Sequence, residues 1–276
     1  MKNILKNTSL AIGLALLALI LVIAVFAHVF YPVSPWQSAA TPLLEPFSQS
    51  GLPLGSDMLG RDVAAGIAYG ARVSLTVGVV STIISVTLGV TIGAVAGFYG
   101  GVLDNLLMRF TELFQTVPQF AMAVVFVAIF SPSLVTIVLA ISLVSWPPVA
   151  RLVRGEVMSL KSREFVKAGI VLGESESGLI FRHILPNAVS PIVVMASLMV
   201  ATAILTESAL SFLGLGDRNM ISWGYMIGAS RTMLRDAWWL SVFPGLAIVV
   251  TVVAVNLIGE GFEKALNPQA HGERKA

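Results

Sequence analysis

Five stretches of the chain contain no Asp, Glu, Lys or Arg and are long enough to cross a bilayer, namely residues 10–30, 73–96, 113–150, 184–205 and 238–259. A helix needs about 20 apolar residues to cross the hydrocarbon core. The run 113–150 has 38 residues, and as one helix it would be about 57 Å long, too long for one crossing. Pro132 interrupts the helical hydrogen-bond ladder within it. We therefore expect two spans there, 113–130 and 134–150.

These runs predict an all-α membrane protein with six transmembrane helices. The composition agrees, because hydrophobic residues make up 56% of the 276 residues. Charged residues make up 12%, against about 25% in an ordinary soluble domain. Such a chain lacks the polar surface of a soluble enzyme or of a nucleic-acid-binding protein. The absence of cysteine excludes disulfides, thiolate metal sites and cysteine nucleophiles.

Basic residues are distributed unevenly between the loops that six spans would leave. The predicted cytoplasmic segments contain 12 Lys and Arg and the outer segments five, although the total lengths are nearly equal. The segments are 1–9, 97–112, 151–183 and 260–276 inside, and 31–72, 131–133 and 206–237 outside. The positive-inside rule then predicts that both termini are cytoplasmic. The first apolar run exceeds the roughly 7–15 residues of a secretory signal, which favours an uncleaved span.

Segment 31–72 is rich in proline and too polar to cross a membrane, so we expect it at the outer surface. Ser56 or Asp57 is a candidate N-cap for a short amphipathic helix over 63–69. Arg61 follows Asp57 by four residues, and we expect Asp57, Arg61 and Asp62 to pair locally. The segment is either a packed lid over the helices or a docking surface for a protein outside the membrane.

Loop 151–183 contains six Lys and Arg and four Glu. Within it, residues 163–172 combine good helix formers with the apolar Phe165, Ile170 and Leu172, and Gly173 fits a helix C-cap. The apolar face of a short helix outside the bilayer needs a cover. A protein partner and the membrane surface are both possible covers, and the pattern alone leaves the two open.

The same loop resembles a known family. Lys167-Ala168-Gly169, Gly173 and Leu185-Pro186 follow the spacing of the EAA motif of ABC importer permeases. Further stretches are similar to the dipeptide, oligopeptide and nickel permeases, in the subunit type lettered C. They lie at 54–63, 69–75, 96–101, 163–166, 181–187, 205–216 and 243–245, and the resemblance extends from about residue 10 to residue 268.

Two positions depart from the family's motif. Its leading glutamate is Lys167 here, which reverses a charge, and its isoleucine is His183. The charge reversal argues against the family's usual salt bridge to an ATPase at position 167. It does not argue against docking of an ATPase at this loop.

The resemblance implies the transmembrane domain of a type I ABC importer in a bacterial inner membrane. It implies a second, homologous permease, two cytoplasmic ATPases and a periplasmic or lipid-anchored substrate-binding protein as partners. The chain has no Gly-x-x-x-x-Gly-Lys-Ser/Thr sequence, so we expect a non-catalytic subunit without a cofactor, with ATP and Mg bound by the ATPases. We expect an N-terminal span and outer segment (1–72), a permease domain (73–262) and a cytoplasmic tail (263–276).

The resemblance also assigns site residues. Residues 151–186 become a coupling loop, the segment that would contact an ATPase. Its expected contact residues are Glu164, Phe165, Lys167, Ala168, Gly169, Leu172, Gly173, His183, Leu185 and Pro186. Asp57, Arg61 and Asp62 are the candidates for outer docking, and no metal ligand is expected.

Three features of the spans carry further expectations. Glu207 follows the fifth apolar run, and an ionisable group near membrane depth indicates a translocation pathway or an outer interface. Gly89, Gly93 and Gly97 are spaced for close helix packing. Pro147 and Pro148 are expected to end or kink the fourth span, and a helix end is the favoured interpretation.

The leading function is import of peptides or a similar small solute. Nickel or another metal chelate, glutathione and opine-type compounds remain alternatives within the family. An ion-coupled secondary transporter is the alternative of another class, but the six predicted spans lack the charges that such carriers use. An intramembrane enzyme would need a metal cluster or a nucleophile–base pair, and the three histidines have no partner at ligand spacing.

Overall fold

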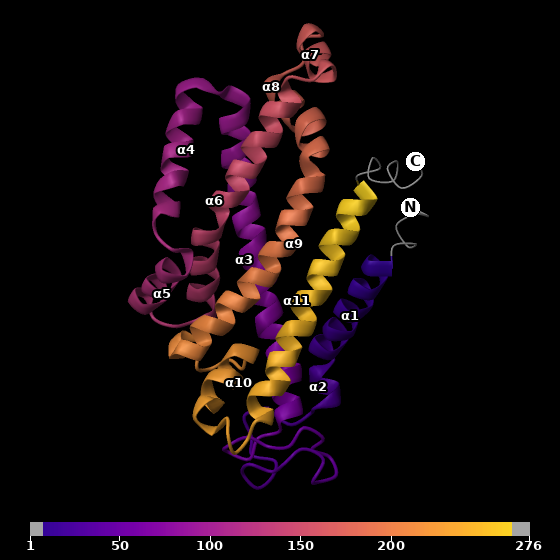
Figure 1. The fold of residues 1–276 in the computed structure, drawn as a ribbon, viewed down its shortest axis with the longest axis vertical. Helices are drawn as coiled ribbons and strands as arrows, with labels where there is room; N and C mark the ends of the chain where they lie inside the picture. Colours follow the sequence, from indigo (N-terminus) through magenta and orange to yellow (C-terminus); the bar gives the residue numbers. More distant parts are fainter. Residues whose placement is uncertain (1–7, 267–276) are drawn as a thin grey trace.

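The computed structural model describes residues 8–266, and its long helices run side by side with short segments at the two ends (Figure 1). The helices are α1 (Thr8–Val25), α2 (Ala27–Phe30), α3 (Val63–Tyr99), α4 (Gly101–Thr116), α5 (Gln119–Phe130), α6 (Leu134–Lys161), α7 (Glu164–Val171), α8 (Glu176–Gly178), the π-helix η1 (Leu179–Ile184), α9 (Leu185–Leu210), the π-helix η2 (Ser211–Leu215), α10 (Trp223–Ser230), the 3-10 helix η3 (Arg231–Met233) and α11 (Trp239–Leu266).

Five helical segments within residues 8–266 are long and apolar enough to cross a membrane, and there are six if a bent pair of helices counts as one broken span. The pair is α4 and α5, whose axes differ by 80°. The expected straight span 113–130 is therefore wrong. Val117 is extended and Pro118 follows it, which separates an amphipathic α4 from a 12-residue α5. Helix α4 contains Asp104, Arg109 and Glu112, so it gives no uncharged run in the sequence.

The short helix expected over 63–69 is the first part of the 37-residue α3. Its N-cap is Asp62, whose side chain accepts a hydrogen bond from the Ala64 amide at 2.8 Å, and not Ser56 or Asp57. The expected domain boundary at residue 72 lies inside this helix. We therefore call residues 31–62, which precede α3, the outer loop.

Two sequence breaks were expected around α6, and one is confirmed. Ser131 has a φ of +69°, and the Ser133 hydroxyl accepts from the Thr136 amide at 3.1 Å, so the chain turns before α6 begins. Pro147 and Pro148, in contrast, do not end the helix. α6 continues through them to Lys161, and the first eleven residues of loop 151–183 are helical.

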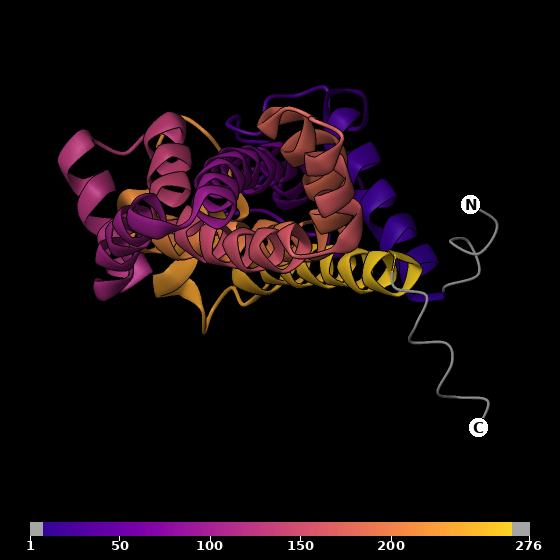
Figure 2. The same cartoon turned by 90° about the horizontal axis from the view of Figure 1, so that it is seen from above.

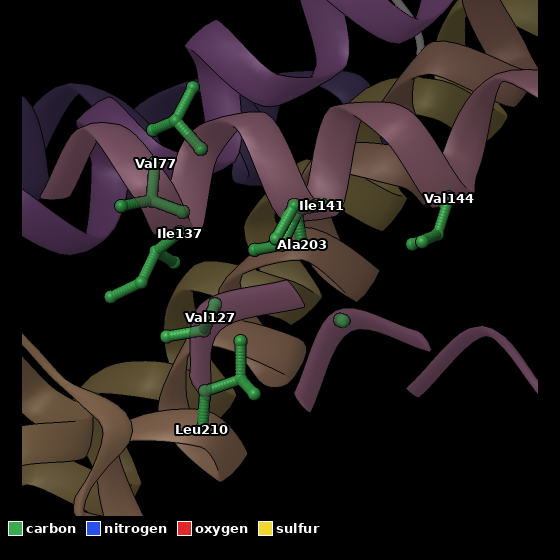
Figure 3. Close-up of a cluster of buried hydrophobic side chains, with 10 residues drawn as sticks. Val77, Val127, Ile137, Ile141, Val144, Ala203 and Leu210 are labelled. Atoms are coloured by element: carbon green, nitrogen blue, oxygen red, sulfur yellow. The ribbon is translucent and has the colours of Figure 1, made fainter. Parts of the chain in front are cut away.

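The core lies where α3 and α6 pack closely along their length. A β-carbon added at Gly97 would lie 2.8 Å from the Arg154 carbonyl oxygen, and Gly89 and Gly93 face α6 equally closely. This confirms the packing expected for the three glycines. Toward the outer half, Val77, Val127, Ile137 and Leu210 join α3, α5, α6 and α9 in one buried cluster (Figure 3).

The polar segments gather at opposite ends of the bundle. The outer loop and α10 lie at one end, while α7 and α8 lie at the other, which also holds the beginning of α1 and the end of α11 (Figure 1). Seen from above, α1 and α11 form one side of the molecule, and α4 and α5 form the opposite side (Figure 2). α11 continues to Leu266, and the rest of the expected tail lies outside the described residues.

Candidate functional site

The helix expected over 163–172 is α7, which projects from one end of the bundle (Figure 1). Its inner face holds Val166 and Gly169, both buried against the rest of the coupling loop. Phe165, Ile170 and Leu172 are exposed, with exposed fractions of 42%, 51% and 85%, and Val171 is also exposed, at 86%. These exposed apolar side chains on a charged loop are the candidates for contact with another surface.

Gly173 ends α7 in the left-handed conformation that the sequence predicted, with a φ of +76°. The Glu174 amide donates to the Gly169 carbonyl at 3.0 Å, and the Gly173 amide donates to the Ile170 carbonyl at 3.0 Å. These two bonds form a Schellman motif, which satisfies the last carbonyls of the helix. The motif reverses the chain toward α8.

The chain that returns from α7 to the bundle is held by a polar contact and by close packing. His183 Nε2 lies 2.8 Å from Glu174 Oε2. A β-carbon at Gly169 would lie 2.7 Å from Leu179 Cδ2, so glycine at the third motif position allows η1 to approach α7. Leu185 and Pro186 are the first residues of α9, which places the end of the motif at the start of a span.

Three further expected contact residues lie on the surface of the coupling loop. Glu164, Lys167 and Ala168 are exposed, and no ion pair within residues 8–266 involves Lys167. The structure therefore places the expected contact residues from Glu164 to Gly173 on or directly after α7, while His183 lies in η1 and Leu185 and Pro186 begin α9.

The outer loop is folded by backbone hydrogen bonds rather than as a helix. Asp57 Oδ1 accepts from the amides of Leu59 and Arg61, both at 2.8 Å. The expected ion pair between Asp57 and Arg61 on a helix is therefore wrong, because the turn brings the Arg61 amide, and not its guanidinium, to the carboxylate. The Arg61 guanidinium lies over the Trp36 ring, 4.8 Å from its centre.

A pocket of about 280 Å³ separates the outer loop from α10. Asp57, Arg61 and Asp62 line one wall, and Tyr225 and Met226 of α10 line the other. Burial raises the pKa of Asp62 above its ordinary value, although hydrogen bonds from the Ala64 and Ala65 amides act in the opposite direction. The three candidates for outer docking thus share one pocket at the end of the bundle away from α7.

Glu207 lies in the last turns of α9 and is only 2% exposed. Its carboxylate accepts hydrogen bonds from Ser211 and Ser222 at 2.7 Å. The sequence left open whether Glu207 lines a translocation pathway or lies at the outer interface. In this structure its carboxylate is enclosed by residues of α3, η2 and the start of α10.

Two further polar contacts were not anticipated from the sequence. Arg154 of α6 makes a two-pronged bond to Asp104 of α4, at 2.5 and 2.6 Å. Arg72, which was expected outside the spans, lies in α3, where it donates to the Ala24 carbonyl and, at 2.8 Å, to that of Val25. These carbonyls end α1, and a cation near a helix C-terminus is stabilising. Each pair is distant in sequence, so spacing gives no signal.

Residues 89–271 match the family of binding-protein-dependent transport system inner membrane components. The chain belongs to this family. It is thus a membrane permease subunit of a transport system. The match covers most of the long helices and the whole coupling loop.

The curated relatives of the permease include peptide transport proteins of the lettered type C. It is 42% identical to the oligopeptide transport system permease protein OppC of Escherichia coli (strain K12), over 94% of this chain and 85% of that one. It is 41% identical to the dipeptide transport system permease protein DppC of the same strain, over 96% and 90%. These relatives confirm the resemblance found in the sequence motifs.

Solved structures with the same fold are membrane domains of ABC transporters. The inward-facing MetNI methionine ABC transporter matches with a TM-score of 0.60 at 15% identity, over 73% of this chain and 96% of that one. An amino acid ABC transporter with histidines matches with a TM-score of 0.56 at 14% identity, over 72% and 94%. The permease therefore has an ABC transporter fold, as the sequence indicated.

Proposed function

We propose that this permease imports peptides as the non-catalytic membrane subunit of an ATP-driven transporter. The observation that carries the proposal is its identity of 42% and 41% to oligopeptide and dipeptide permeases over nearly the whole chain. A second permease would complete the pathway, and two cytoplasmic ATPases would bind ATP and Mg. A substrate-binding protein would deliver the peptide from outside.

The exposed face of α7 supports an ATPase as the partner at the coupling loop. Burying a large apolar side chain contributes roughly 1.5–3 kcal/mol, so Phe165, Ile170 and Leu172 together supply much of a subunit contact. The face lies on a projecting helix that ends at Gly173 and leads back through η1 into α9. A movement of the ATPase at α7 would thus reach a membrane-spanning helix directly.

The outer pocket supports docking of the binding protein at the opposite end. It combines an apolar lining with Asp57, Arg61 and Asp62, and Met58 and Leu59 beside it are exposed. Protein interfaces with a charged rim around an apolar centre have this composition. A binding protein that docks at this pocket would place the outer loop outside the membrane. The excess of basic residues in the coupling loop favours the same orientation, with both termini in the cytoplasm.

Uptake in reconstituted vesicles tests the proposed function. Vesicles that contain both permeases and the ATPases, with binding protein outside and ATP inside, should accumulate labelled di- or oligopeptides. Accumulation should continue when ionophores collapse proton and sodium gradients. Uptake that stops with the gradients and ignores ATP would show an ion-coupled carrier. ATP-driven uptake of a nickel chelate, glutathione or an opine, without any peptide uptake, would overturn the peptide assignment alone.

A further inference from the structure

Glu207 is a buried carboxylate bonded by three elements of the chain. Ser211 of η2 and Ser222, the residue before α10, each donate a hydroxyl hydrogen bond to Oε1 at 2.7 Å. Ser74 of α3 lies 3.5 Å from Oε2, at the limit of a hydrogen bond. A buried carboxylate is costly unless it is hydrogen-bonded, so this cluster has a strong preference for its present arrangement.

The first turn of α10 is built around this carboxylate. Ser222 is the N-cap of α10, because its hydroxyl oxygen accepts from the Tyr225 amide at 3.1 Å while its hydrogen goes to Glu207. The Trp223 amide donates to Ser74 Oγ at 3.3 Å. Negative charge near the start of a helix is stabilised by the unpaired amides there. Glu207 therefore links the start of α10 to α9 and α3.

The rest of α10 is also fitted closely to the same support. A β-carbon at Gly228 would lie 2.9 Å from the Ser211 carbonyl oxygen, and one at Gly224 would overlap Ser208. The opposite side of α10 presents Tyr225 and Met226 to the outer pocket. The orientation of the pocket wall thus depends on how α10 is attached at Glu207.

Glu207 attaches α10 to α9. Helix α9 begins at Leu185 and Pro186 of the coupling loop and contains Glu207 near its outer end. We propose that Glu207 is a positioning residue that fixes α10 to α9, so that the outer pocket wall and the coupling loop are connected through one helix. The attachment follows from the contacts alone. Its consequence for transport rests on the proposed function.

Labelling of a buried cysteine tests the attachment directly. Ile221 precedes Ser222 and is buried, so Ile221→Cys in the complete complex should react slowly with a membrane-impermeant maleimide from the outer side. Glu207→Ala and Ser222→Ala should each raise that rate by about tenfold or more, because loss of a bond to a charged group favours local opening. Glu207→Gln keeps a carbonyl acceptor for Ser222 and should stay near the parent rate.

Ser211→Ala is the matched control, because Ser211 donates to the same Oε1 over the same distance but makes no link to Ser222 of α10. It should leave the labelling rate near that of the parent. Equal rates in Glu207→Ala and the parent would overturn the proposal. So would a Ser211→Ala rate as high as that of Ser222→Ala.

ATP hydrolysis provides a second readout. A purely structural defect would lower basal and stimulated hydrolysis together, whereas a positioning defect would lower stimulated hydrolysis alone. Glu207→Ala should keep basal hydrolysis and assembly but lose most stimulation by the binding protein. Stimulation at the parent level would overturn the link to transport. If the parent complex itself shows no stimulation by the binding protein, the proposed function fails, whereas the labelling rates still decide the attachment.

Discussion

At the scale of single residues, Gly173 has a φ of +76° that other residues adopt only at a cost of roughly 1–2 kcal/mol. A β-carbon there would meet nothing within 4 Å, so any effect of a substitution comes from the backbone. We predict that Gly173→Val displaces α7 and abolishes coupled transport while the spans still insert. Gly155→Val is the control, because Gly155 also has open space but lies inside α6. Equal uptake in the two variants would contradict the prediction.

Lys167 replaces the family's leading glutamate, and the structure leaves its side chain exposed. The fold therefore places no demand on the sign of the charge. We predict that Lys167→Glu retains expression and most peptide uptake, measured in the vesicle assay. Loss of uptake with normal assembly would show that an ATPase has adapted to the lysine.

The sequence identified Gly173 because a glycine after an apolar helix is a local signal. It did not identify Asp62 as the N-cap of α3, because Ser56, Asp57 and Asp62 are all capping residue types and the turn that decides between them depends on Asp57 binding two backbone amides. The neighbours of Glu207 were likewise out of reach, since Ser74 and Ser222 are 133 and 15 residues away.

At the scale of elements, the Asp104–Arg154 ion pair joins α4 to α6, beside the rings of Phe110 and Phe114, which pack on Trp146. The side chain of Asp104 is 9% exposed and that of Arg154 33%. Asp104→Asn removes the negative charge and replaces one of the two acceptor oxygens by an NH2 donor that faces the Arg154 guanidinium. We expect this to destabilise the purified permease by about 2 kcal/mol. Thermal unfolding in detergent measures this.

The exposed pair Glu260–Lys264 provides the control for the α4 prediction. Its atoms are 3.8 Å apart and both side chains are more than half exposed, at 58% and 55%. Glu260→Gln should change stability by less than about 1 kcal/mol. A similar shift in Glu260→Gln and Asp104→Asn would contradict the role given to the α4–α6 pair.

The outer loop and α10 form the two walls of the outer pocket. Asp57→Ala with Arg61→Ala removes the carboxylate that holds the loop turn and the cation that stacks on Trp36. We predict weaker binding-protein stimulation and weaker uptake, with the ATPases still bound. Arg218→Ala, at an exposed position that does not line the pocket, is the control. Loss of the ATPases in the double variant would contradict the assignment.

The boundaries of a helix were predictable where charged residues border a single apolar run of helical length. α1, α9 and α11 were found in this way, and α7 was found from its flanking charges and its glycine. α4 was missed because its charges are partly satisfied inside the protein by Arg154. Uncharged runs therefore miss helices whose charged side chains pair with a neighbouring helix. Proline pairs, in turn, predict helix ends that the structure does not have, as at Pro147-Pro148.

At the scale of the whole molecule, the long axis separates the outer loop from the coupling loop (Figure 1). The distribution of basic residues predicts that the coupling loop is cytoplasmic. Single cysteines replacing the exposed Ser48 and Ser162 should label from opposite sides of the membrane. The chain has no native cysteine, so the signal belongs to the introduced residue. Labelling of both from one side would contradict this topology.

We propose that α7 couples ATP hydrolysis by the ATPases to movement of the membrane helices, and Leu172→Asp tests this role most directly. Leu172 is 85% exposed, so the substitution costs the isolated permease little. In a subunit contact it would instead place a charge on a buried apolar surface. Reconstituted complexes should lose peptide uptake and substrate-stimulated ATP hydrolysis, as with Gly173→Val. Full coupled transport by both variants would contradict the account and leave α7 as a helix that lies on the membrane surface.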